Sequence, residues 1–299
     1  MPAQSPTCTR AEKIAVLLPS LEGGGAERSM LNLAAGFLAE GREVDIVLCQ
    51  AKGAFLDEIP AGATMIELEA TGGLRARWII ARSNLQDFFV RLRPVLLAKK
   101  TAPEVASIRS LQRYIVASQP DVILSALPYA NLSAIWAKEL SGSRVPVIVS
   151  ERIALLSYCA APSNSRKWRW RYLPELVRRT YPRADRVIAV SDHVANELIT
   201  TIGLSKDSVV AVPNPVVDGA LRACAQQALA HPWFRQDGPP VILAAGRLTE
   251  QKDFATLIHA FAAVRTDREA RLVILGEGRL RDDLEQLVCT LGIQADVYM

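Results

Sequence analysis

Cysteine is scarce and scattered in this sequence. The five cysteines are odd in number, and no two of them form a C-x-x-C pair: Cys8, Cys49, Cys159, Cys224 and Cys289. This usage indicates neither a disulfide framework nor a zinc site. It fits a protein of a reducing compartment, and we therefore expect a cytoplasmic chain.

Long apolar runs are also missing. Half of the 299 residues are hydrophobic, but no stretch approaches the roughly 20 apolar residues that a membrane-spanning helix needs. The first ten residues, MPAQSPTCTR, are polar and lack the apolar core of a secretory signal. We therefore expect a globular chain that would meet a membrane only from its surface, as a peripheral protein.

The small net charge of +4 conceals two strongly basic segments. Residues 74–100 contain seven arginines or lysines against one acid, Asp87, and residues 166–186 contain eight against Glu175 and Asp185. Both segments carry aromatic residues among the charges, a composition typical of a helix at an anionic membrane surface. The alternative is a solvated helix face whose arginine stems cover apolar neighbours. We expect no nucleic-acid partner, because nothing here resembles a nucleic-acid-binding module.

Short β-branched runs alternate with stretches of helical periodicity, such as residues 26–41. We expect strands over seven runs: 13–19, 44–49, 64–68, 121–126, 145–150, 186–191 and 209–214. Continuous apolar strands separated by helices predict a parallel sheet that is covered on both faces. The sequence therefore predicts a Rossmann-like N-terminal domain over residues 1–213.

The same alternation restarts after a connection rich in proline and glycine. Strands are expected over 241–246, 271–276 and 295–299, with helices over 252–265 and 279–291. The overall prediction is an α/β chain with two Rossmann-like, doubly wound parallel-sheet domains. The second domain, residues 214–299, is predicted to be incomplete.

Two permanent cations mark the first strand-to-helix turn of this second domain, in the stretch LAAGRLTEQKDF. Ligands of open α/β sheets bind at the carboxyl ends of parallel strands, where helix N–H groups favour anions. Arg247 and Lys252 at this turn could hold a diphosphate, the arginine as a two-pronged donor and the lysine as a point charge. The alternative is a surface ion pair of Arg247 with Glu250 or Asp253, worth at most about 1 kcal/mol.

Two further turns carry candidate residues. The glycines of SLEGGGAERSM let a loop approach a phosphate or sugar, with a helix N-terminus behind it, although a tight turn that needs positive φ is the alternative. The stretch does not match the G-x-G-x-x-G fingerprint. In VIVSERIALLS, Glu151 and Arg152 follow a strand. With a raised pKa, Glu151 could orient an acceptor hydroxyl or take its proton, or it could be merely an ion-pair partner.

Several motifs taken together, in their order along the chain, resemble the family 4 glycosyltransferases of the GT-B fold. They are GGGAERS, the SER of VIVSERIALLS, VIAVSDHVANELI, VVAVPNPV, AAGRLTEQKDFATLIHAF and LVILGEGRLRDDLEQL. The resemblance covers nearly all of residues 13–299. It implies that the first domain binds the acceptor and the second a nucleotide-sugar. It also implies transfer with retention of anomeric configuration, without a metal or a further cofactor.

The resemblance also implies roles for individual residues. Arg247 and Lys252 would hold the donor diphosphate and stabilise the leaving nucleotide, and Glu151 and Arg152 would bind the acceptor. The donor would be contacted by six further residues: Gly24, Gly25, Gly246, Gly276, Glu277 and Gly278. The implied activity is the transfer of a sugar from a nucleotide diphosphate-sugar to a glycan or lipid-linked acceptor, in cell-surface polysaccharide or glycolipid synthesis.

One expected feature of the family is missing. Its paired glutamates, with seven residues between them, belong to a region that would follow Met299. The two matches to this spacing, Glu269 with Glu277 and Glu277 with Glu285, are interpreted as coincidences, because the first spans a whole strand and separates its carboxylates by roughly 26 Å. We therefore expect a truncated donor domain with an open sheet edge. One alternative is an inactive fragment that binds a membrane or a partner. The other is a GT-B sugar epimerase, which would need several acid/base residues around the sugar, whereas Glu151 is the single obvious candidate.

Overall fold

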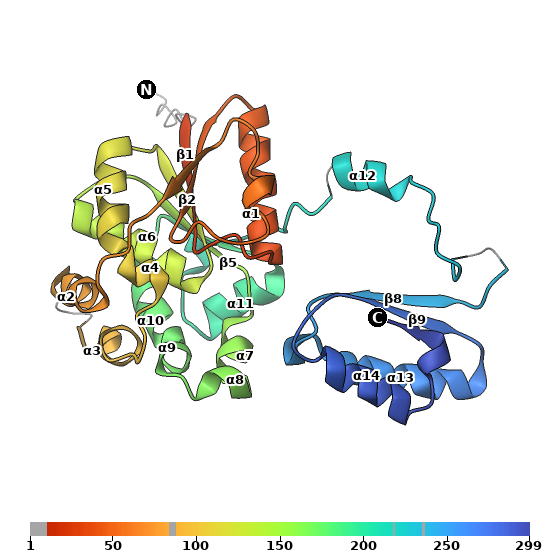
Figure 1. Cartoon of the computed structure of the whole chain (residues 1–299). Helices are drawn as coiled ribbons and strands as arrows, with labels where there is room; N and C mark the ends of the chain where they lie inside the picture. The colour runs from red at the N-terminus through yellow and green to blue at the C-terminus, as the bar shows by residue number, and fades with distance from the viewer. Residues whose placement is uncertain (1–10, 84–87, 218, 235–236) are drawn as a thin grey trace, which may run out of the picture. The chain divides into compact units, whose positions relative to one another are not determined.

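The computed structural model describes residues 11–83, 88–217, 219–234 and 237–299. The chain divides into two compact units, Met1–Asp218 and Gly219–Met299, so the division comes shortly after the expected boundary at residue 213 (Figure 1). Cys8 and Asp87, which entered the sequence-based expectations, lie outside the described residues.

The first unit is built on a seven-stranded parallel sheet. Its strand order is β3-β2-β1-β4-β5-β6-β7, and every neighbouring pair is parallel. The α/β fold class is thereby confirmed, and each of the seven expected strands is present within a few residues of its expected bounds. The strands are β1 (Lys13–Leu18), β2 (Glu43–Leu48), β3 (Thr64–Glu67), β4 (Val122–Ala126), β5 (Val147–Glu151), β6 (Arg186–Ala189) and β7 (Val209–Ala211).

Helices cover both faces of this sheet, as the apolar strands predicted (Figure 1). On one face, α1 (Gly25–Ala39) buries Met30, Leu31 and Ala34 against β1, β2 and β4. It ends shortly before Gly41, which has the positive φ of 74° that favours glycine after a helix. The larger core on the other face includes the fully buried Trp136. The helices that contribute to it include α2 (Gly73–Ser83), α5 (Ile108–Ser118), α6 (Pro128–Ser141), α10 (Leu173–Thr180) and α11 (Asp192–Thr200).

The two basic segments form short elements rather than one continuous helix each. Residues 88–96 form α3 (Phe88–Arg91) and a π-helical turn (Leu92–Leu96). The second segment forms α9 (Trp168–Arg171) and then α10, which has a proline in its first turn. Three short helices lie next to the two segments in sequence: α4 (Pro103–Ala106), α7 (Leu155–Ala160) and α8 (Pro162–Ser165). Prolines begin α4 and α8. Among the described residues, no helix has both the length and the apolar character that crossing a bilayer requires.

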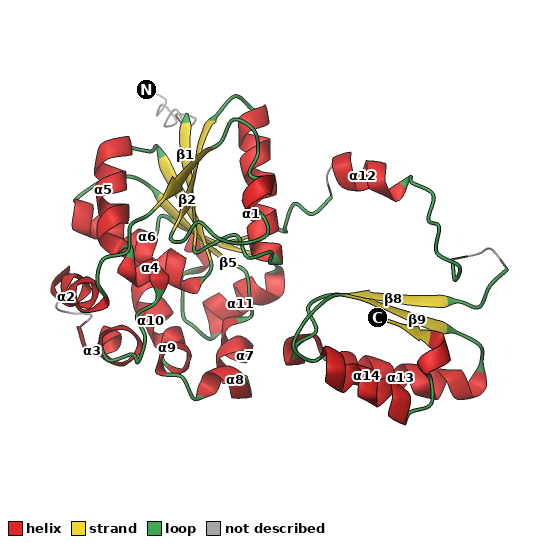
Figure 2. Ribbon diagram, in the orientation of Figure 1, coloured by secondary structure: helices red, strands yellow, loops and turns green. Residues whose placement is uncertain are grey.

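The second unit has the three strands that the sequence predicted. They are β8 (Val241–Ala245), β9 (Arg271–Leu275) and β10 (Val297–Tyr298), paired in parallel in the order β10-β9-β8. The helices α13 (Phe254–Asp267) and α14 (Arg281–Thr290) lie on the same face of the sheet (Figure 2) and bury Ile258 and Phe261 beneath it. Leu243, Leu275 and Tyr298 are exposed. A further helix, α12 (Gly219–Ala225), precedes this sheet in the chain.

Candidate functional site

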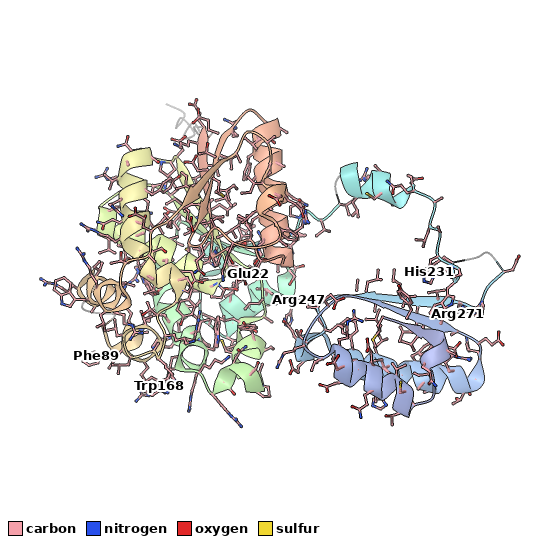
Figure 3. The ribbon with its side chains drawn as sticks, in the orientation of Figure 1. Glu22, Phe89, Trp168, His231, Arg247 and Arg271 are labelled. Carbon is pink, nitrogen blue, oxygen red and sulfur yellow. The ribbon has the colours of Figure 1, made fainter. Side chains whose placement is uncertain are left out.

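The turn after β8 brings two cations to one glycine. Arg247 directly follows Gly246 at the carboxyl end of β8 (Figure 3), and a short 3-10 turn (Glu250–Lys252) leads from there into α13. The stem of Lys252 folds back over Gly246, since a Cβ atom added to this glycine would lie 3.4 Å from Lys252 Cε. Both side chains therefore belong to the same strand-to-helix turn, although four residues separate them in sequence.

The charges of this cation pair are not neutralised. In the described parts of the chain, neither Arg247 nor Lys252 forms an ion pair, and Glu250 pairs instead with Arg279. The alternative expectation, a surface ion pair of Arg247 with Glu250 or Asp253, is therefore wrong for this structure. Both cations are exposed and available to an anion. Across the described residues, no group of three or more His, Cys, Asp or Glu could hold a metal ion.

Gly276 and Gly278 have a structural role that the sequence did not reveal. The loop after β9 lies directly on the loop after β8, and Leu248 N donates to Glu277 O at 2.9 Å. A Cβ atom at Gly276 would lie 1.9 Å from Gly246 O, and one at Gly278 would lie 2.3 Å from Leu248 O. Only glycine fits at these two positions because the backbones touch. Nucleotide contact by Gly276, Glu277 and Gly278 stays a prediction.

The spacing between Glu277 and Glu285 has a local explanation. Both carboxylates accept hydrogen bonds from Arg281, which lies four residues from each, at 2.7 Å and 3.1 Å. Arg281 also donates to Gly276 O at 3.0 Å and so ties the loop after β9 to α14. Glu277 and Glu285 therefore form two ion pairs with the same arginine at the surface.

The three glycines of the loop after β1 differ in conformation. Gly23 has a φ of 100°, so the tight-turn alternative applies to this residue. Gly24 has a φ of −89° and precedes α1 without a side-chain cap, and Gly25 is the first helical residue. No atom lies within 4 Å of a Cβ position at Gly25, so the helix start is open on that side. Donor contact by Gly24 and Gly25 stays a prediction, and Arg28 from the same motif pairs with Glu58.

The side chain of Glu151 lies in the interior of the first unit, at the carboxyl end of β5. It has no exposed surface, because Tyr181 covers it and donates from Oη to Glu151 Oε2 at 2.9 Å. The backbone N–H of Arg152 donates to Oε1 at 3.2 Å. Burial raises the pKa of Glu151 to about 7, and these hydrogen bonds partly oppose the shift. Contact of Glu151 with an acceptor stays a prediction.

A buried polar network, missed by the sequence reasoning, fixes this carboxyl. Asn131 Nδ2 donates to Tyr181 Oη at 2.9 Å and to Ser150 O at 3.0 Å. Ser125 Oγ donates to Asn131 Oδ1 at 2.8 Å, so the network connects the ends of β4 and β5 through α6. An asparagine inside the apolar run PYANLSAIW was the available signal, because a buried amide needs partners.

Arg152 points from the end of β5 to α1 and to the segment after β7. Its guanidinium donates to Asn214 Oδ1 and lies 3.0 Å from Met30 Sδ, and burial lowers its pKa. Arg152 Nε is buried and has no hydrogen-bond partner. Asn32 Nδ2 donates to Pro215 O at 2.8 Å, so two side chains attach residues 214–215 to α1 and β5 within the first unit. Acceptor binding by Arg152 stays a prediction.

Two bacterial transferases are similar to the chain in sequence. It is 26% identical over 291 residues to GalNAc-alpha-(1->4)-GalNAc-alpha-(1->3)-diNAcBac-PP-undecaprenol alpha-1,4-N-acetyl-D-galactosaminyltransferase of Campylobacter jejuni, a match that covers 95% of this chain and 67% of that protein. It is 32% identical over 124 residues to N-acetylgalactosamine-N,N'-diacetylbacillosaminyl-diphospho-undecaprenol 4-alpha-N-acetylgalactosaminyltransferase of the same organism, covering 42% of this chain and 32% of that protein. The chain thus spans about two thirds of the length of the first relative and about a third of the second.

Solved structures share the fold. The lipopolysaccharide outer core galactosyltransferase WaaB matches with a TM-score of 0.59 and 19% identity, over 95% of this chain and 66% of that one. Anabaena Alr3699/HepE in complex with UDP and glucose matches with a TM-score of 0.63 and 17% identity, over 97% and 68%. A putative UDP-N-acetylglucosamine 2-epimerase from Listeria monocytogenes matches with a TM-score of 0.55 and 14% identity, over 97% and 68%. The fold alone therefore does not separate transferases from epimerases.

The family models make this separation. Residues 226–299 match the model described as Glycosyl transferases group 1, and residues 23–218 match the model described as Glycosyltransferase Family 4. The second match alone includes well over half of the sequence and agrees with the GT-B-like arrangement of strands. The chain belongs to Glycosyltransferase Family 4.

Proposed function

We propose that the chain transfers a sugar, with retention of anomeric configuration, from a nucleoside diphosphate-sugar to a glycan or lipid-linked acceptor in cell-surface polysaccharide or glycolipid synthesis. The observation that carries this proposal is the exposed and unpaired cation pair Arg247 and Lys252. It follows the carboxyl end of β8, where open α/β sheets bind their ligands.

The two cations suit the charge that develops when a glycosidic bond to a diphosphate breaks. A planar guanidinium can donate two parallel hydrogen bonds to phosphate oxygens, and an ammonium adds a compact point charge. The stem of Lys252 lies over Gly246, so its charge belongs to the same turn as Arg247. Charges placed in advance stabilise a leaving group without reorganisation during the reaction.

The names of the relatives support the substrate classes of this proposal. Both Campylobacter transferases act on acceptors linked through a diphosphate to undecaprenol, and Alr3699/HepE was crystallised with UDP-glucose. We infer a uridine nucleotide as the first donor to test and a lipid-linked glycan as the first acceptor.

We also propose that the chain binds the inner face of the cell membrane as a peripheral protein. Among its described residues, the first basic segment exposes four large apolar side chains: Leu74 at 84%, Trp78 at 59%, Phe89 at 80% and Leu97 at 55%. The guanidinium of Arg82 lies 4.4 Å from the Trp78 ring centroid, which places a cation beside an aromatic anchor. Apolar anchors among basic residues suit a membrane with anionic lipids. Sedimentation with phosphatidylglycerol vesicles should fall as salt rises, whereas salt-independent sedimentation would contradict this proposal.

The transfer proposal is tested by a reaction and by its stereochemistry. The chain is incubated with UDP-sugars and a short-chain isoprenoid diphosphate glycan, and the anomeric configuration of the product is read by NMR. Arg247→Ala should abolish most of the transfer, while Arg268→Ala, which removes an exposed arginine at the other end of the unit, should leave it unchanged. Equal rates for Arg247→Ala and the unaltered chain, or a product of inverted configuration, would contradict the proposal.

A further inference from the structure

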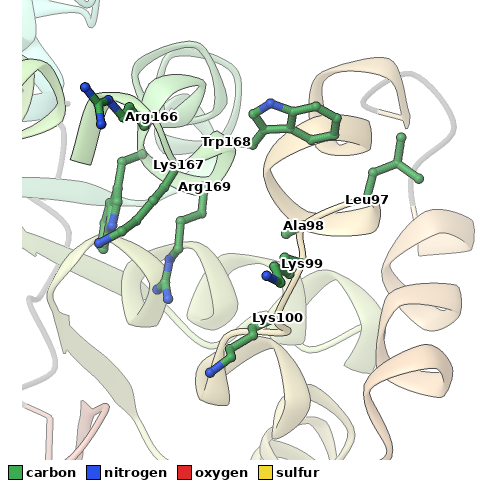
Figure 4. A pocket seen from close by; sticks show the side chains of 9 residues that line it. Leu97, Ala98, Lys99, Lys100, Arg166, Lys167, Trp168 and Arg169 are labelled. Atoms are coloured by element: carbon green, nitrogen blue, oxygen red, sulfur yellow. The ribbon is translucent and has the colours of Figure 1, made fainter. Parts of the chain in front are cut away.

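A cavity of about 720 Å³ lies where the two basic segments meet in the first unit (Figure 4). The loop Leu97–Lys100 forms one wall, and the segment Arg166–Trp170, which includes most of α9, forms the other. More than 60 residues separate the two walls in sequence, so the fold assembles this cavity. Its volume is within the range of small-molecule binding sites, which is about 300–1,000 Å³.

The walls of this cavity carry charge of one sign. No residue that lines it is acidic, and among the described residues none of its five cations takes part in an ion pair: Lys99, Lys100, Arg166, Lys167 and Arg169. Two apolar side chains in the lining are also exposed, Leu97 at 55% and Trp168 at 46%. The cavity therefore combines uncompensated positive charge with exposed apolar surface.

One of the five cations is held in place. The guanidinium of Arg169 lies 4.7 Å from the ring centroid of Tyr129 and 4.6 Å from that of Trp170. Tyr129 Oη donates to Arg169 O at 2.8 Å, and Tyr158 packs edge-on against Trp170 with centroids 5.1 Å apart. Arg169 Nε is buried and has no hydrogen-bond partner. This ordering means that little rotamer entropy remains to be lost when an anion binds.

The nearby buried acid does little to cancel this charge. Burial raises the pKa of Glu104 and disfavours its charged form. The positive charge of Arg169 acts in the opposite direction but is a smaller effect. A cluster of unpaired cations with an apolar rim fits a ligand that carries phosphate at the end of an apolar chain. A free sugar would leave the cations without a partner, and a bare phosphate would leave the rim unused.

We propose that this cavity binds the phosphate head of a lipid, with the phosphate or diphosphate among the five cations and the first part of the chain against Leu97 and Trp168. The lipid is either the isoprenoid diphosphate of the acceptor or a phospholipid of the bilayer. The inference deepens the proposed function by naming a site on the first unit for a phosphorylated lipid, and it rests on that function for the identity of the acceptor.

The test measures direct binding of defined probes. Farnesyl diphosphate, farnesol and inorganic diphosphate are titrated below their critical micelle concentrations, and vesicles of phosphatidylcholine with phosphatidylglycerol are sedimented with the protein. The cavity variant is R166Q/K167Q, and the control variant R144Q/K206Q removes the same charge from two exposed positions outside the basic segments. Trp168→Phe serves as a second variant that keeps the charge. Thermal unfolding checks that all three variants fold.

We expect saturable binding of farnesyl diphosphate that is about thirtyfold weaker in R166Q/K167Q, which corresponds to about 2 kcal/mol at 1.4 kcal/mol per tenfold. Farnesol and inorganic diphosphate should each bind more weakly than farnesyl diphosphate, and R144Q/K206Q should bind it like the unaltered chain. A parallel loss of vesicle binding would identify the bilayer as the source, and its retention would identify the isoprenoid. Equal losses in the cavity and control variants, or no loss in either, would overturn the proposal. UDP binding at Arg247 is measured separately, so failure of the proposed function is distinguishable from failure of this site.

Discussion

The buried carboxyl of Glu151 should make the stability of the first unit depend on pH in a defined window. Glu151 is fully buried at the end of β5, and burial raises its pKa from 4.5 to about 7. In the unfolded chain the carboxyl ionises near its ordinary pKa, so between these two values only the folded state holds the proton. The free energy of unfolding should therefore fall as the pH rises from 4.5 to about 7 and level off above it.

The size of this effect follows from the shift. Each pKa unit corresponds to about 1.36 kcal/mol, so ionisation of Glu151 should remove about 3 kcal/mol of stability across the window. Glu151→Gln removes the titration while keeping the side-chain shape and one oxygen that can accept from Tyr181 Oη. The free energy of unfolding of this variant should lack the descent between pH 4.5 and about 7.

The measurement is urea unfolding at several pH values, followed by tryptophan fluorescence. Four of the five tryptophans belong to the first unit, so the signal reports mainly on that unit. The difference between the unaltered chain and Glu151→Gln isolates this carboxyl, and Glu43→Gln, at an exposed position on β2, is the matched control. Parallel stability profiles for the unaltered chain and Glu151→Gln would refute the assignment of a raised pKa to Glu151.

Three further substitutions test the packing around the candidate sites. Tyr181→Phe removes the hydroxyl donor to Glu151 and should lower the free energy of unfolding by about 1–3 kcal/mol, measured in urea; an unchanged value would show that the bond contributes nothing. Gly276→Ala places a Cβ 1.9 Å from Gly246 O and should destabilise the second unit by about 1–3 kcal/mol, as read from amide hydrogen exchange in β9; unchanged exchange would contradict the close backbone contact. Gly36→Ala lies inside α1 with no atom within 4 Å of its Cβ position, so it should raise the melting temperature by removing about 0.5–1 kcal/mol of backbone entropy cost.

The fold was largely predictable because its strands are short, apolar and regularly spaced. Runs such as KIAVLLP and RLVILG lie in the buried middle of parallel sheets, where both faces are covered, or partly covered in the second unit. The order β3-β2-β1-β4-β5-β6-β7 was not predictable from these runs, because the sequence of a strand does not specify which other strands pair with it. Prolines inside the basic segments, such as Pro94 and Pro174, are the sequence signal for the breaks in these segments.

A candidate site was predictable only where its residues lie close together in the sequence. Arg247 and Lys252 could be found because one turn contains both. The need for glycine at position 276 could not be predicted, because it depends on close contact with the backbone of a second loop, at Gly246. The network from Ser125 to Glu151 joins residues from four elements, and the cavity between Lys99 and Arg166 joins segments far apart in the chain. Such contacts are products of the tertiary fold.

The central claim, that Arg247 and Lys252 bind a diphosphate, is tested most directly by calorimetric titration of the chain with UDP, ADP and GDP. We predict saturable binding of at least one nucleotide, weakened by roughly 1.5–3 kcal/mol in Arg247→Ala, the range for a hydrogen bond to a charged group. Lys252→Ala should weaken it less, and Arg268→Ala should leave it unchanged. Full affinity in the double variant of Arg247 and Lys252 would contradict the claim.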